Sequence, residues 1–144
     1  MKLLAIICAM LMCLCFNAHA ADTTPSNDNR VTLEVTAEER DFILERMRRM
    51  LETLTSVQQT VILDSPENAD NLVRNLVAYT TEQYPNGWYE RMPEGFKAME
   101  DRLNERWRVL AENNTTDSKQ ILKNTVQVMA TCNACHRSYK IGLE

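Results

Sequence analysis

The chain has 144 residues, of which 44% are hydrophobic and 25% charged, and its formal net charge at pH 7 is −4. This length fits one domain, and an acidic chain without a basic run gives no support to nucleic-acid binding. Glycine and proline are rare and strand-like alternation is scarce, so the composition favours an all-α fold.

The N-terminus has the three parts of a secretory signal peptide. Lys2 gives a basic start, the stretch from Leu3 to Phe16 is apolar but short for a membrane span, and the next residues end in Ala-His-Ala at Ala20. We therefore expect residues 1–20 to be cleaved and the rest of the chain to be exported to a periplasm of the bacterial type.

A polar leader and a first long helix follow. Residues 21–35 predict a mobile leader, and residues 31–35 within it alternate like a strand but have no partner run, so we expect an extended lead-in. Thr36 and Glu39 form a capping-box pattern that opens the helical domain, residues 36–144, with a helix reaching about residue 63. Its apolar residues recur in steps of four and three, as in the inward seam of a bundle, while Arg46 is assigned to another face. The seam consists of Ile43, Met47, Met50, Leu54, Val57 and Val61.

The second helix is expected to begin at Ser65, with Pro66 in the first helical position. Pro85 ends it, and Asn86-Gly87 forms a turn. Residues 88–92 are predicted to be a connector without a helix of their own.

The third helix is predicted over about residues 93–112. The fourth begins at Asp117 with another capping-box pattern and continues to Ile141, with Gly142 as its C-cap. Four helices with short connections favour an antiparallel up-down-up-down four-helix bundle.

Residues 132–136, near the end of the fourth helix, read Cys-Asn-Ala-Cys-His, which is the attachment pattern of c-type haem. On a helix, Cys132 and Cys135 share one face, so both sulfurs can form thioethers with one porphyrin. His136 then supplies the proximal ligand of the iron. The motif predicts one covalently attached haem c.

Three other interpretations of the motif are weaker. A zinc site needs a fourth ligand, but Cys132, Cys135 and His136 are the only cysteines and histidine left after cleavage. A thioredoxin-like C-x-x-C begins a helix after a strand, whereas this one follows a long helical pattern. A haem-free structural bundle leaves the motif unexplained. Because the single histidine is committed to iron, no Cys/His catalytic grouping is available, and we do not expect an enzyme.

The other face of the iron must be held by an upstream methionine, by a less usual group or by nothing. No second histidine remains after cleavage, and no methionine follows His136. Met47 and Met50 lie in the inward seam of the first helix, which we expect to cross the fourth helix near the haem. Gap-filling in the core is the ordinary role of such methionines, but an iron needs a partner and few donors exist.

Several stretches resemble the class II c-type cytochromes, the cytochrome c′ and cytochrome c556 group. The C-terminal CNACHRSYK is similar to the haem-binding end of that family, and Tyr84-Pro85-Asn86-Gly87 to the turn after its second helix. Residues 92–96 resemble the entry to its third helix, and Met47-Arg48-Arg49-Met50 resembles its M-K-x-M stretch. The resemblance covers nearly all of the chain after residue 20.

This resemblance implies a four-helix bundle, often a homodimer, with covalent haem and His136 as proximal ligand. It makes Met47 the distal ligand, with Met50 as second choice. The family often has an arginine near a haem propionate, four residues before that methionine. Ile43 stands there in this chain, so Arg40 or Arg46 would have to take that role.

Two functions follow from the resemblance. A six-coordinate haem predicts a soluble periplasmic electron carrier whose iron alternates between Fe(II) and Fe(III) and whose partners are transiently bound redox proteins. A five-coordinate haem with an open position predicts instead a protein that binds small gases such as NO or CO.

Overall fold

The computed structural model describes residues 28–80, 84–85, 87–113 and 115–144. The expected signal peptide, the leader up to residue 27 and Asn86 of the expected turn lie outside the described residues. Within the described part most residues are helical, which confirms the expectation of a largely helical chain.

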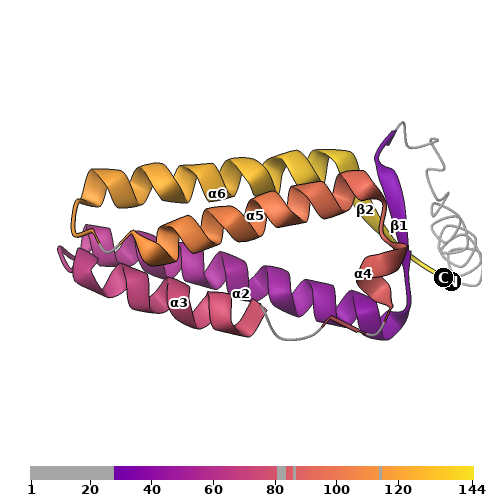
Figure 1. The fold of residues 1–144 in the computed structure, drawn as a ribbon, viewed down its shortest axis with the longest axis horizontal. Coiled ribbons are helices and arrows are strands. Elements are labelled where there is room, and N and C mark those ends of the chain that lie inside the picture. The colour runs from indigo at the N-terminus through magenta and orange to yellow at the C-terminus, as the bar shows by residue number, and fades with distance from the viewer. Residues whose placement is uncertain (1–27, 81–83, 86, 114) are drawn as a thin grey trace, which may run out of the picture.

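Four long helices lie side by side along the length of the molecule, and a pair of short strands lies at one end (Figure 1). Helix α2 packs along α3 and α6, and α5 packs along α3 and α6. The elements in chain order are strand β1 (Val31–Val35), helix α2 (Ala37–Ile62), the 3-10 turn η2 (Pro66–Asn68), α3 (Ala69–Thr80), the short α4 (Trp88–Arg91), α5 (Glu94–Glu112), α6 (Ser118–Ser138) and strand β2 (Tyr139–Leu143).

The start of α2 is the capping box that the sequence predicts. The amide of Glu39 donates to the Thr36 hydroxyl at 3.2 Å, and the amide of Thr36 donates to the Glu39 carboxylate at 2.9 Å. Both of these helix-end donors are therefore satisfied by local side chains. This fixes where the helix begins and hence which of its residues face inward.

The other predicted helix starts are only partly correct. Ser65 makes no capping bond, and Pro66 begins a 3-10 turn before α3. Asp117 does cap α6 by accepting from the Lys119 amide at 3.0 Å, but the side chain of Gln120 donates to Asn124 and does not complete a box. The expected connector at residues 88–92 contains the single-turn helix α4.

The largest correction concerns the two ends of the domain. The segment expected as a lead-in without a partner is strand β1, which pairs in parallel with β2, Val31 opposite Tyr139 and Val35 opposite Leu143. The last helix therefore ends at Ser138 and not at residue 141, and Gly142 is a strand residue and not a helix cap. A Cβ at Gly142 would lie 2.6 Å from the Thr32 side chain, so the strands approach closely here.

The interior has two parts. The main core lies among the four long helices and contains Met50, Leu54, Val57, Ala69, Val73, Leu76, Trp107, Leu110, Ala111, Ile121 and Val128. The end cluster joins β1 to α2 and α4 and contains Leu33, Val35, Ile43, Trp88 and Met92. Burial of the apolar face of β1 in the end cluster explains why this short strand is held in place. No helix in the described part of the chain is long and apolar enough to span a membrane.

Candidate functional site

The predicted haem motif lies in the last turns of α6. Cys132 and Cys135 are free thiols, both half-buried, and Cys132 packs against the main core. His136 is exposed on the next position of the helix. Because α6 is regular through these residues, the two sulfurs project from the same side, as the sequence predicts.

Burial raises the pKa of both thiols, and at Cys135 the nearby Glu100 carboxylate adds to the effect. This direction is opposite to the lowered pKa of the reactive cysteine in a redox C-x-x-C. The described residues also contain no group of three metal-binding side chains, so they give no support to a zinc site.

A buried polar network lies beside the motif. The Arg46 guanidinium donates to the Thr80 carbonyl at 3.0 Å and to the Asn104 side chain at 3.2 Å, and it lies 3.3 Å from the Glu100 carboxylate. Tyr84 donates its hydroxyl to the same carboxylate, and its ring lies under the guanidinium. Arg46 is thus inside the protein and not on another face of α2, because α3 and α5 supply partners for its charge.

Glu100 is the least satisfied member of this network. Its Oε2 atom is buried and has no hydrogen-bond partner among the residues that the structure describes. Burial raises the pKa of Glu100, while the Tyr84 hydrogen bond and the Arg46 charge act in the opposite direction. Burial and the Glu100 carboxylate also raise the pKa of Tyr84, so its hydroxyl remains a donor. The carboxylate therefore has an unused acceptor in the interior, close enough to Cys135 to affect that thiol.

Sequence reasoning did not find this network. Its one signal is the spacing of Arg46, three residues after Ile43 and four before Met50, which puts it on the buried side of α2. The resemblance had named Arg40 and Arg46 as possible propionate partners. Arg40 is exposed beside Asp41, whereas Arg46 lies in the interior.

The two methionines considered as iron ligands, Met47 and Met50, lie in different parts of the interior. Met50 is buried in the main core, the cluster that Cys132 touches. Met47 is half-buried and packs against the end cluster, as does Tyr139, three residues after His136. Met129, by contrast, is 43% exposed and accepts a hydrogen bond from Gln58.

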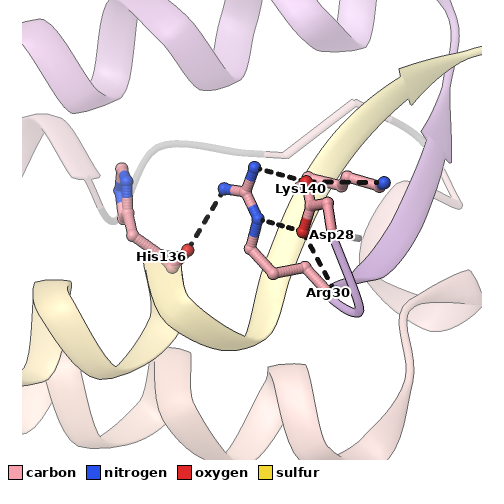
Figure 2. Close-up of polar contacts among 4 residues, drawn as sticks. All are labelled: Asp28, Arg30, His136 and Lys140. Atoms are coloured by element: carbon pink, nitrogen blue, oxygen red, sulfur yellow. Dashed lines mark hydrogen bonds and ion pairs between the residues drawn. The ribbon is translucent and has the colours of Figure 1, made fainter. Parts of the chain in front are cut away.

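A second polar cluster holds the main chain of His136 (Figure 2). Arg30, just before β1, donates from Nη1 to the His136 carbonyl at 3.3 Å. Asp28 accepts from the same guanidinium at 2.9 and 2.8 Å, and Lys140 lies 3.5 Å from its carboxylate. The imidazole of His136 points away from this cluster.

This donor set fits a c-type haem. Two half-buried thiols lie three residues apart on α6 with an imidazole directly after the second, and Glu100 has a buried carboxylate oxygen without a hydrogen-bond partner among the described residues. Cys132, Cys135 and His136 are the residues that would hold it.

Comparison with known proteins gives the same family. The model of the family described as Cytochrome C' matches residues 25–140 of the chain. Neither the curated proteins nor the solved structures gave a match. The matched range includes the haem motif, the network around Glu100 and the part of α2 that contains Met47. The chain therefore belongs to the cytochrome c′ family, a family of haem-binding class II c-type cytochromes.

Proposed function

We propose that this protein is a periplasmic monohaem c-type cytochrome that carries electrons and is not an enzyme. Its fold would be the antiparallel up-down-up-down four-helix bundle of class II. The observation that carries the proposal is the position of Cys132 and Cys135, two half-buried thiols three residues apart on α6, directly before His136, in a chain of the cytochrome c′ family.

Each cysteine has a defined role in the proposal. Cys132 and Cys135 would hold the haem through thioethers: each S–H group would add across one vinyl group, with the sulfur joined to one carbon and the hydrogen to the neighbouring carbon. This addition needs no external oxidant.

His136 would bind the iron through its imidazole, which leaves no histidine for acid–base chemistry in the chain after residue 20. When bound, haem supplies an iron that accepts and returns one electron. An electron carrier needs a weak docking face for its partner but no substrate pocket. Family membership, with the signal-peptide pattern of residues 1–20, supports export to the periplasm.

A methionine of α2 is proposed as the second axial ligand, Met47 before Met50. Met47 and Tyr139 both pack against the end cluster, and Tyr139 is three residues after His136. A thioether ligand favours Fe(II) and suits a carrier. With no methionine bound, the same site would take a small gas such as NO or CO, which is the alternative function.

The test is to produce the full chain with a c-type haem maturation system and to measure its haem content and absorption spectra. We expect one haem per chain that stays attached after denaturation, and a low-spin ferric spectrum. Cys132→Ala and Cys135→Ala are each expected to lose one thioether. Haem that is extracted by acid and solvent from the unaltered chain refutes covalent attachment. A high-spin spectrum with rapid CO binding to the ferrous form refutes the carrier and supports the gas-binding alternative.

A further inference from the structure

His136, the residue proposed as proximal ligand, is contacted by a residue from near the other end of the described sequence. Arg30 and His136 are 106 positions apart in sequence, yet Nη1 of Arg30 donates to the main-chain carbonyl of His136 at 3.3 Å. That carbonyl is in the last turn of α6, where carbonyl groups have no helical partner. A cation at this end of a helix is also favoured by the helix dipole.

Asp28 fixes the direction of the Arg30 guanidinium. Its two carboxylate oxygens accept from Nε and Nη2 at 2.9 and 2.8 Å, which leaves Nη1 to point at His136 (Figure 2). Such a fork-to-carboxylate pair sets the guanidinium plane as well as its position. Arg30 keeps the pKa of Asp28 well below its usual range, so the carboxylate stays charged. The ammonium group of Lys140 also lies 3.5 Å from the Asp28 carboxylate.

The pairing of β1 with β2 places Arg30 close to the end of α6. Val31 lies opposite Tyr139 in the parallel ladder, so Arg30 is placed beside the residues that join α6 to β2. Leu33 and Val35 anchor β1 by burial in the end cluster. The contact from Arg30 to His136 therefore follows from the register of the strands.

We propose that Arg30, oriented by Asp28, is a positioning residue for His136: it fixes the peptide that carries the imidazole and thereby the orientation of the proximal ligand. This rests on the proposed function, in which His136 binds the iron. The Arg30 side chain is 40% exposed, and an exposed ion pair contributes little to stability. Its removal should change the ligand geometry much more than the unfolding midpoint.

The experiment uses the full haem-loaded chain and the variants Arg30→Gln, Arg30→Lys and Asp28→Asn. Arg108→Gln is the control, because it removes the same charge from an exposed pair with Glu105 on α5. The readouts are the hyperfine-shifted proton resonances of His136 in the ferric protein, hydrogen exchange of the amides at residues 136–139, the reduction potential and the urea midpoint.

We expect Arg30→Gln to move the His136 resonances and to speed exchange by roughly 2- to 10-fold, the loss of one ordinary hydrogen bond. Arg30→Lys keeps the charge but loses the fork, so it should move the resonances while leaving the reduction potential near that of the unaltered protein. Asp28→Asn should act in the same direction with a smaller effect. The urea midpoints should stay close to that of the control.

Unchanged resonances and exchange in Arg30→Gln relative to Arg108→Gln would overturn the inference while leaving haem attachment intact. Full restoration by lysine would also overturn it, because charge alone would then explain the effect. If Arg30→Gln does not fold, Asp28→Asn decides by the same readouts. If the unaltered chain attaches no haem, the proposed function fails, and the positioning role fails with it.

Discussion

The guanidinium of Arg46 lies 3.3 Å from the carboxylate of Glu100, and only 8% and 10% of the two side chains are exposed. The pair joins α2 to α5 beside the half-buried Cys135. Two charges in such a place are tolerated because each has further partners: Thr80 and Asn104 for Arg46, and Tyr84 for Glu100.

Replacing Glu100 by alanine is expected to lower the free energy of unfolding by about 3–5 kcal/mol, because it leaves the Arg46 charge buried without its counter-ion. Glu100→Gln keeps an acceptor for Tyr84 and should cost less. The control is Glu105→Ala, which breaks an exposed pair with Arg108 and should cost about 0–1 kcal/mol. Urea unfolding at pH 7 measures all three, and equal losses at positions 100 and 105 would contradict the buried-pair argument.

Glu39 gives a prediction for pH dependence. Its hydrogen bond from Arg91 and then that from the Thr36 amide hold its pKa below the ordinary value of 4.5. A lowered pKa in the folded state means that the unfolded state binds more protons, so this contribution is present above about pH 4.5 and is lost as the pH falls through the folded pKa.

Glu39→Gln should therefore cost about 1–2 kcal/mol at neutral pH, because the neutral amide can keep the capping box but loses the charge-assisted pair with Arg91. The difference between variant and unaltered protein should shrink toward pH 3. Chemical unfolding at several pH values measures it. A difference that stays constant across this range would show that the charge of Glu39 is not involved.

Trp107 provides a test of the main core. Its side chain is 1% exposed, and its indole Nε1 is buried without a hydrogen-bond partner in the described structure. Trp107→Ala should cost about 3–5 kcal/mol through the cavity it leaves. Trp107→Phe keeps much of the volume and removes the unsatisfied N–H group, so it should cost only about 1–2 kcal/mol. Similar costs for the two variants in urea unfolding would show that the N–H group has a partner, such as an ordered water.

The axial ligand can be identified by spectroscopy of the haem-loaded chain. Met47→Ala should convert a low-spin ferric spectrum to a high-spin one and allow CO to bind the ferrous form rapidly. Met50→Ala is expected to leave the protein low-spin but less stable by about 2–5 kcal/mol, because Met50 is buried in the main core. Met129→Ala, at an exposed site, is the control. The opposite pattern for Met47 and Met50 would assign the ligand to Met50.

The sequence by itself determined the parts of this protein that depend on local spacing. Thr36 and Glu39 are close enough in the chain to cap α2 in any surroundings, and periodicity located the four long helices to within a few residues. Cys132 and Cys135 share a face because any regular helix puts residues three apart on the same side. The residues of the candidate site could thus be named from the sequence, because their relation to one another is local.

Only the tertiary structure decided which polar residues are buried and where the chain ends meet. The spacing of Arg46 puts it on the buried side of α2, but burial of its charge requires Thr80 and Asn104 on other helices, and the sequence does not show these partners. The pairing of β1 with β2 joins segments separated by the whole helical domain, and five residues of weak alternation at each end give no local sign of it. Partners that are distant in sequence become neighbours only when the helices pack, and this packing brings Arg30 to the carbonyl of His136.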